Sequence, residues 1–116
     1  MENTIDNIFA ISKDIRYVAI YKNNTLKTKS KSCENQSSLE SDKYEELFIN
    51  PTILKAASQR GNLDCGGLDY ILIKYGNFFQ CVVPIDKGHI SVCIESFSNP
   101  VKIALKILKL IENSKL

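Results

Sequence analysis

Hydrophobic and polar positions change their period several times along this chain, and each change marks a predicted element. Residues 4–13 place apolar side chains at helical spacing, which predicts a short helix. The run "IRYVAIY" at 15–21 is rich in β-branched and aromatic residues, and "TLKTKSK" at 25–31 alternates strictly, so both are predicted strands. The asparagines at 23–24 tolerate the left-handed backbone of a tight turn. The first third of the chain is therefore predicted to be a helix and a β-hairpin.

The middle of the chain is predicted to hold one loop and one bent helix. Residues 32–41 are polar and serine-rich, which indicates a loop that ends with Ser41 as a helix N-cap. Apolar residues then recur at helical spacing from 42 to 60. Asn50-Pro51 should bend or divide this helix, since a residue before proline avoids the helical region. Proline also suits a first helical position, so Asn50 could cap a second helical segment. The helix is expected to end near Gly61.

Three strands and a terminal helix complete the pattern. The strands are joined by predicted turns at Gly76-Asn77 and at 86–88. The helix should be capped by Ser98 or Asn99 and should carry a broad apolar face with a lysine stripe opposite. The predicted strands are 68–75, 77–85 and 89–96. In the helix at 100–112, the apolar face is Val101, Ala104, Leu105, Leu108 and Ile111, broadened by Ile103, Ile107 and Leu110, and the polar stripe is Lys102, Lys106 and Lys109.

This order of elements predicts an α+β fold: a single five-stranded antiparallel sheet with helices on its faces, in the order α-β-β-α-β-β-β-α. Strands joined by short turns pair antiparallel, and the broad apolar face of the last helix must lie flat on the sheet. The sequence contains no internal repeat and no linker long enough to divide it, so residues 1–116 are predicted to form one domain.

Composition excludes several classes of function. With 116 residues and a net charge of +2, the chain is too weakly basic for a dedicated nucleic-acid binder. No apolar run approaches the ~20 residues that cross a bilayer, which predicts no membrane insertion. The start "MENTIDNIF" carries acids where a secretory signal would be basic, so a cytoplasmic protein is expected.

The four cysteines, Cys33, Cys65, Cys81 and Cys93, form no C-x-x-C pair, and His89 is the sole histidine. This set does not build a zinc site by short spacing, so we expect free thiols and neither a metal nor another cofactor. His89, at the edge of a turn, is expected to be a partly exposed strand residue.

The cysteines nevertheless leave a thiol-dependent enzyme as one alternative. Cys65 could be a nucleophile, but it is expected to follow a helix C-terminus beside Asp64, where a thiolate is disfavoured, so we predict a structural connector. Cys81 and Cys93 would face each other, as a possible redox pair, if the turn at 86–88 were a three-residue loop centred on Lys87. Reduced core thiols are the competing prediction.

The segment "LDYILIKYGNFFQCVVPIDKGHISVCIESFSNPVKIALKIL", three strands that run into an amphipathic helix, resembles the roadblock/dynein light chain family, within the longin-like and profilin-like group of folds. The order of elements is similar over essentially the whole length. The resemblance implies a non-enzymatic, usually dimeric platform that binds small GTPases or scaffolds complexes. It also implies a sheet in which the second and third strands are the two edges.

Of these two edges, the third strand is too apolar to remain open, so we expect a homodimer through residues 69–75 and the preceding helix. The lysines of the second strand would either discourage further pairing or contact an acidic partner. A small-ligand sensor is a further alternative, with a pocket between the sheet and the helix at 100–112. The expected dimer residues are Tyr70, Leu72, Ile73, Tyr75, Tyr44, Leu47, Phe48 and Leu54, and the lysines are Lys27, Lys29 and Lys31.

Overall fold

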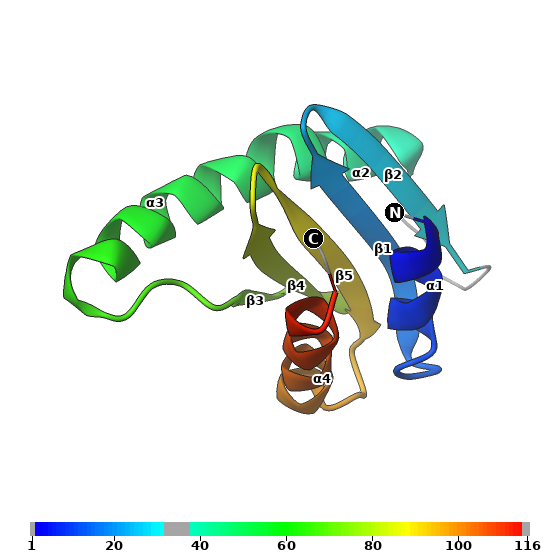
Figure 1. Ribbon diagram of the computed structural model, residues 1–116. Coiled ribbons are helices and arrows are strands. Elements are labelled where there is room, and N and C mark those ends of the chain that lie inside the picture. Colours follow the sequence, from blue (N-terminus) through cyan, green and yellow to red (C-terminus); the bar gives the residue numbers. More distant parts are fainter. Residues whose placement is uncertain (1, 32–37, 115–116) are drawn as a thin grey trace.

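The first three elements follow the hydrophobic pattern in the computed structural model, which describes residues 2–31 and 38–114 (Figure 1). Helix α1 (Glu2–Phe9) begins earlier and ends earlier than expected. Strands β1 (Ile15–Lys22) and β2 (Thr25–Ser30) form the predicted hairpin. Its two turn residues, Asn23 and Asn24, have φ of 52° and 66°, which confirms the left-handed turn. Residues 32–37 of the predicted loop lie outside the described residues.

The middle helix is longer than predicted and is not broken at proline. It runs without interruption through α2 (Leu39–Tyr44), the π-helical turn η1 (Glu45–Ile49) and α3 (Asn50–Asp64). The N-cap is Ser38 rather than Ser41, because the Ser38 hydroxyl accepts a hydrogen bond from the Ser41 N–H at 3.1 Å.

The π-helical turn explains why the helix continues past Pro51. The N–H of Asn50 bonds to the carbonyl of Glu45, which is the wide i→i+5 turn of a π-helix. Pro51 then occupies the first turn of α3, where its missing N–H and fixed φ are tolerated.

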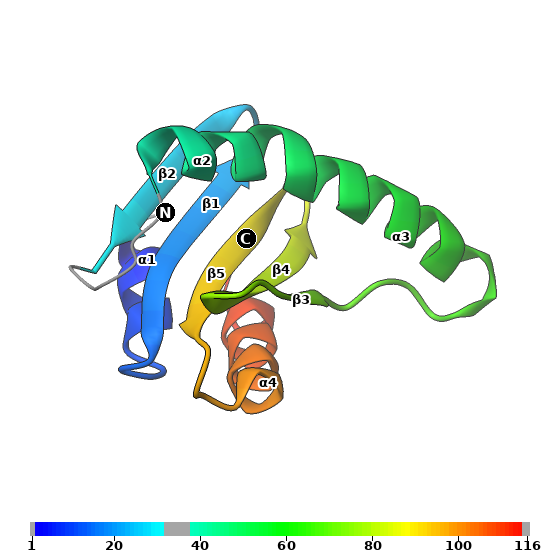
Figure 2. The ribbon, with the colours of Figure 1, turned by 180° about the vertical axis from the view of Figure 1, so that it is seen from behind.

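The remaining strands and the last helix complete an antiparallel sheet. They are β3 (Ile71–Lys74), β4 (Phe78–Ile85), β5 (Gly88–Glu95) and α4 (Pro100–Glu112). The strand order is β2-β1-β5-β4-β3, so β2 and β3 are the edges as expected. Strand β3 is shorter than predicted because the preceding residues lead the chain back from the far end of α3 (Figure 2).

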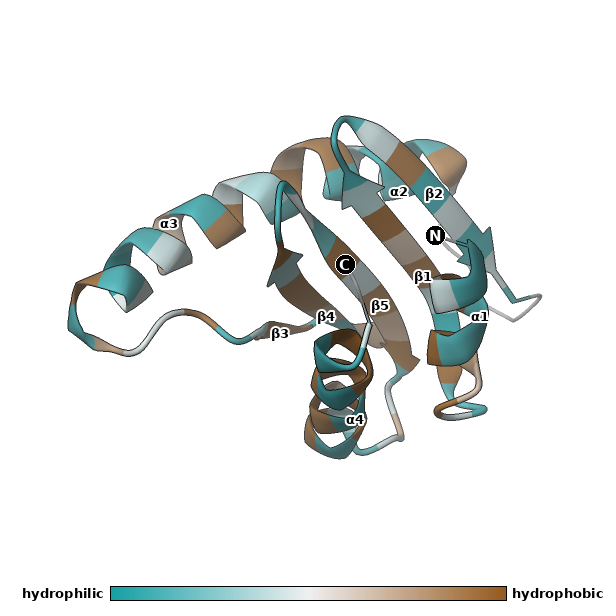
Figure 3. Cartoon of the chain, viewed as in Figure 1, coloured by the Kyte–Doolittle hydropathy of each residue, from teal (hydrophilic) through white to brown (hydrophobic). Residues whose placement is uncertain are grey.

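Helices cover both faces of the sheet (Figures 1 and 2). Helices α1 and α4 lie on one face, and the α2–η1–α3 helix crosses the other. Apolar residues concentrate on the central strands and along α4 (Figure 3). The buried core on the α1/α4 face consists of Ile5, Ile8, Ile15, Val18, Ile20, Cys81, Val83, Ile90, Val92, Ile94, Ile103, Ala104 and Ile107.

Helix α4 has the predicted Asn99 cap, which accepts a hydrogen bond from the Lys102 N–H at 3.2 Å, but its buried face is rotated from the expected one. Ile103, Ala104 and Ile107 are buried, whereas Val101 and Leu105 are 47% and 55% exposed. The three lysines of the predicted stripe are exposed. Apolar residues occur almost all round this helix, so its contact with the sheet selects the buried side.

The C-terminal part of α3 and the segment that follows it, residues 58–70, project beyond the sheet (Figures 1 and 2). We call this segment the arm. At its tip, Gly67 donates its N–H to the Gly61 carbonyl at 3.0 Å, and a Cβ on Gly61 would lie 3.1 Å from the Gly67 carbonyl carbon. Gly66 and Gly67 have φ of 80° and 92°, which suits glycine. Cys65 is the exposed C-cap of α3 at this reversal.

Candidate functional site

One side of the α2–η1–α3 helix presents large apolar side chains to solvent. Tyr44 and Phe48 stack on each other with ring centroids 5.3 Å apart. Leu39, which the sequence analysis did not select, is also exposed on this helix. We name this surface the apolar strip, and its members are Leu39, Tyr44, Leu47 and Phe48, which are 66%, 58%, 53% and 57% exposed.

The strand edge beside the strip is β3. It pairs with β4, and no strand of the described chain pairs with its other side. The hydroxyl of Tyr75, just after β3, donates a hydrogen bond to Glu45 Oε1 at 2.9 Å. Tyr75 and Tyr44 also line a common hollow with Phe78. The Tyr44 end of the strip and the end of β3 are therefore neighbours on one surface.

The expected dimer residues divide into two groups in the structure. Tyr44, Leu47 and Phe48 face solvent and Tyr75 is 36% exposed, whereas Leu54 is 6% exposed. Leu54 was wrongly assigned to the surface, because α3 turns that side chain toward the sheet. Tyr70 and Leu72 pack against the core on the α4 side, and Ile73 is half-buried, so the edge offers mainly its backbone for pairing.

The lysines of β2 are engaged within the chain. Lys29 forms an ion pair with Asp6 of α1 at 2.9 Å, and Lys31 donates a hydrogen bond to the Lys13 carbonyl at 2.8 Å. Both ammonium groups lie 6.0 Å from the centre of the Phe9 ring. Lys27 is exposed on the same strand. This face of β2 therefore holds α1 in place, which the sequence did not indicate.

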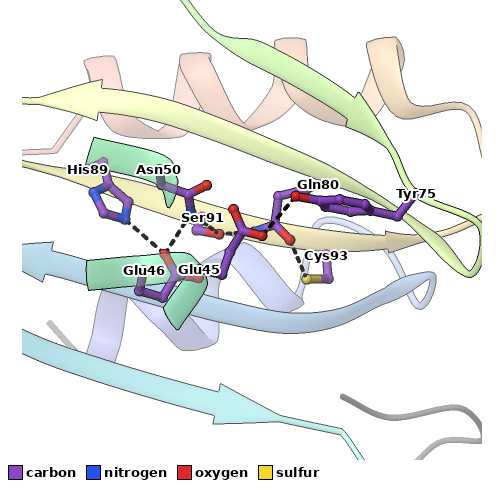
Figure 4. A network of polar contacts seen from close by, with 8 residues as sticks. All are labelled: Glu45, Glu46, Asn50, Tyr75, Gln80, His89, Ser91 and Cys93. Atoms are coloured by element: carbon purple, nitrogen blue, oxygen red, sulfur yellow. Dashed lines mark hydrogen bonds and ion pairs between the residues drawn. The ribbon is translucent and has the colours of Figure 1, made fainter. Parts of the chain in front are cut away.

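A polar cluster lies between the π-helical turn and the sheet (Figure 4). Glu46, at the centre, is fully buried; its Oε1 lies 2.8 Å from His89 Nε2 and accepts a hydrogen bond from Asn50 Nδ2 at 2.9 Å. Gln80 donates from Nε2 to the Ser91 hydroxyl, and the Cys93 thiol donates to Gln80 Oε1 at 3.1 Å. The members of the cluster are Glu46, Asn50, Gln80, His89, Ser91 and Cys93.

The cluster corrects two expectations. His89 is 2% exposed rather than partly exposed, because the middle helix covers its face of β5. Cys81 pairs with Val92, and Cys93 pairs with Gln80, since residues 86 and 87 form a two-residue turn. Cys81 and Cys93 consequently lie on opposite faces of the sheet, so the register excludes the redox pair that was one alternative; both are buried free thiols, which was the competing prediction.

Some buried polar atoms in this region have no hydrogen-bond partner within the described chain. They are Tyr17 Oη, Glu45 Oε2, Glu46 Oε2 and Asn50 Oδ1. Burial raises the pKa of the Tyr17 hydroxyl well above its ordinary value, and the nearby Glu46 and Asp42 carboxylates add to the rise. Burial also raises the pKa of the Glu45 and Asp42 carboxyls. Negative charge on these three groups is therefore disfavoured.

The described thiols are poor nucleophiles or lack an activating neighbour. Burial raises the pKa of Cys81 to about 12 and that of Cys93 well above its ordinary value. Cys65 is exposed, and its Sγ lies 3.4 Å from Asp64 Oδ1. His89 bonds instead to Glu46. Cys33 lies outside the described residues.

Two further features of the described chain bear on function. Its histidine, cysteine and acidic side chains form no group of three or more that could hold a metal ion. None of its helices combines the length and the apolar character needed to cross a membrane.

The fold and the site define the class of this protein: an α+β domain with one five-stranded antiparallel sheet between two helical layers, an open edge strand and a buried polar cluster. A comparison with family models and a search of the curated proteins both find no match for this chain.

Proposed function

We propose that this chain is a non-enzymatic, homodimeric interaction platform of the roadblock type. The observation that carries the proposal is the continuity of the β3 edge with the apolar strip. Exposed apolar surface next to an unpaired strand is unfavourable in water and promotes aggregation unless a partner covers it. A second copy of the chain covers both features at once.

In the proposed dimer, the two β3 strands pair antiparallel about a two-fold axis. Each backbone would satisfy the unpaired groups of the other, and the two apolar strips would pack against each other. Because the arm projects past β3 on the same side of the molecule, it would lie beside the second subunit (Figure 2). Leu63, 78% exposed on the arm, would gain an apolar neighbour there.

The state of the thiols supports a function without covalent catalysis. The only exposed described cysteine, Cys65, sits at a helix C-terminus, whose dipole disfavours a thiolate. The resemblance alone supplies the proposed client, which is a small GTPase or another protein of a signalling complex that docks on the assembled dimer.

Light scattering behind a size-exclusion column tests the proposal. Leu47→Glu, in the strip, should convert a dimer into a monomer, because a carboxylate would have to be desolvated in the interface. Leu105→Glu on α4 is the matched control, since the two leucines are 53% and 55% exposed, and it should remain dimeric.

A wild-type protein that is monomeric at micromolar concentration would refute the dimer. Dissociation by Leu105→Glu rather than by Leu47→Glu would move the interface to α4 and equally refute this arrangement. Circular dichroism of both variants separates dissociation from unfolding.

A further inference from the structure

A hollow of about 390 Å³ lies where α3 passes over the end of the sheet formed by β1 and the β4–β5 turn. One part of its wall is apolar and the other part is basic or hydrogen-bonding. The apolar lining consists of Tyr21, Pro51, Leu54, Pro84 and Ile85, and the polar lining consists of Lys55, Ser58, Lys87 and His89, with Gly88 between the last two.

His89 connects this hollow to the polar cluster. The ring is 2% exposed, and it still forms part of the hollow's lining. One ring nitrogen, Nε2, is held by Glu46 at 2.8 Å. The other points away from Glu46 (Figure 4), and no residue of the described chain bonds to it.

The tautomer of His89 follows from its neighbours. Glu46 Oε1 also accepts a hydrogen bond from Asn50 at 2.9 Å, so the same oxygen acts as the acceptor for both groups. Nε2 then carries the proton, and Nδ1 is the nitrogen available to a ligand. It accepts a hydrogen bond when the ring is neutral and donates one when the ring is protonated. A carboxylate that orients an imidazole toward a binding partner is a common arrangement in functional sites.

The charge of the lining selects the sign of the ligand. Lys55 and Lys87 contribute two ammonium groups, and no aspartate or glutamate of the described chain forms part of the lining. The titratable groups that act on His89 are Glu46 and Glu45 from the middle helix behind it, Lys55 from α3 and Lys87 from the turn. The Tyr21 ring lies 5.7 Å away. An anion is favoured at the open side of the ring.

We propose that the hollow is a binding site for a small carboxylate with an apolar body. The carboxylate lies between the two lysines, at the Nδ1 side of the His89 ring. The apolar body packs on Pro51, Leu54 and the Tyr21 ring. This site includes neither the apolar strip nor β3, and it adds ligand binding to the proposed platform function.

The single histidine makes the site directly observable. In protein labelled with ¹³C-histidine, the ring signals arise from His89 alone. Benzoate is the probe, benzamide is its uncharged counterpart, and inorganic phosphate is an anion without an apolar body. We expect benzoate to shift the ring signals saturably, benzamide to do so much less, and phosphate to bind at least several-fold more weakly than benzoate.

Variants of the lysines test the geometry without disturbing the buried cluster. Lys55→Gln and Lys87→Gln should each weaken benzoate binding by about two- to five-fold, as expected for partly exposed ion pairs. Lys102→Gln on α4 is the control and should leave it unchanged. Leu47→Glu should also leave it unchanged, so that failure of the dimer and failure of this site are distinguished.

Three results would each overturn the proposal. The first is the absence of a saturable shift with benzoate up to roughly 10 mM, a concentration at which even weak fragments bind. The second is an equal response of the ring signals to benzoate and benzamide. The third is an equal loss of benzoate binding in Lys102→Gln and Lys55→Gln. If phosphate binds more tightly than benzoate, the site prefers a phosphate, which contradicts the proposed carboxylate ligand.

Discussion

The buried pair of Glu46 and His89 should be one of the strongest single contributions to the stability of this domain. Glu46 is fully buried, and its Oε1 is the acceptor for two groups, His89 at 2.8 Å and Asn50 at 2.9 Å. Replacing Glu46 with leucine keeps most of the side-chain volume and removes both hydrogen bonds. Two buried donors then lose their acceptor.

The magnitude follows from those two donors. Each unsatisfied buried donor costs about 1–3 kcal/mol, although Asn50 keeps a weak second contact with the Ser91 hydroxyl at 3.4 Å. We therefore expect Glu46→Leu to lower the free energy of unfolding by about 2–5 kcal/mol, which is a large part of the roughly 5–15 kcal/mol of an ordinary domain.

A double-mutant cycle separates the pair from its surroundings. His89→Leu alone leaves the Glu46 carboxylate buried with one donor fewer, and should cost a similar amount. The double variant leaves neither partner of the pair behind. Its loss of unfolding free energy should therefore be smaller than the sum of the two single losses by about 1.5–3 kcal/mol. Glu40→Leu, an exposed carboxylate on α2, is the matched control and should change stability by less than about 0.5 kcal/mol.

Urea unfolding followed by far-UV circular dichroism measures these differences. All variants should carry Leu47→Glu, so that dimerisation does not contribute to the measured stability. Additive single costs, or a Glu46→Leu variant as stable as Glu40→Leu, would show that the two groups are not coupled and would refute the argument. If Glu46→Leu does not fold, Glu46→Gln, which retains one acceptor oxygen, should fold with an intermediate loss.

Three other predictions concern single positions. Gly88→Ala should destabilise the protein by about 3 kcal/mol or more, because the added Cβ would lie 1.7 Å from the Tyr21 carbonyl oxygen. Gly76→Ala is the control and should be close to neutral, since its Cβ meets nothing within 4 Å. Thermal unfolding compares the two variants, and equal losses of stability would contradict the reasoning. Burial raises the pKa of Glu45 in the folded state, so its contribution to stability is present at low pH and is lost as the pH rises from about 4 through the raised pKa. Glu45→Gln should therefore flatten the decrease of the urea midpoint with rising pH. An unchanged pH profile would count against this prediction. Cys65 should react with a maleimide at the rate of an ordinary exposed thiol, whereas Cys81 should react only when the protein unfolds. Mass spectrometry of the labelled peptides measures both rates. A Cys65 that reacts far faster would support a catalytic thiol instead.

Local sequence signals are sufficient to predict the helices and strands and most of the strand boundaries. Periods of two and 3.6 residues, paired asparagines at a hairpin and an asparagine-proline helix start are local signals, and they act over a few residues. The strands, the left-handed turn at 23–24 and the Asn99 cap follow from such signals. The α+β class follows from their order.

Local signals failed where two preferences compete within a short stretch. Asn50-Pro51 was expected to bend or divide the helix, yet the helix passes it through a π-helical turn with Pro51 in the first turn of α3. In the same way, the apolar residues all round α4 give no preferred side, and the contact with β4 and β5 decides that Ile103 is buried and Leu105 exposed.

The polar cluster was decided by the tertiary structure alone. His89 and Ser91 alternate on one face of β5, a signal visible in the sequence, but their burial depends on a helix 43 residues away from His89 in the chain, at Glu46. A hydrophobic pattern reports which side chains avoid water, and it does not report which polar groups find buried partners. Only the placement of the middle helix over β5 brings these groups together, closes the cluster, and forms the basic hollow beside it.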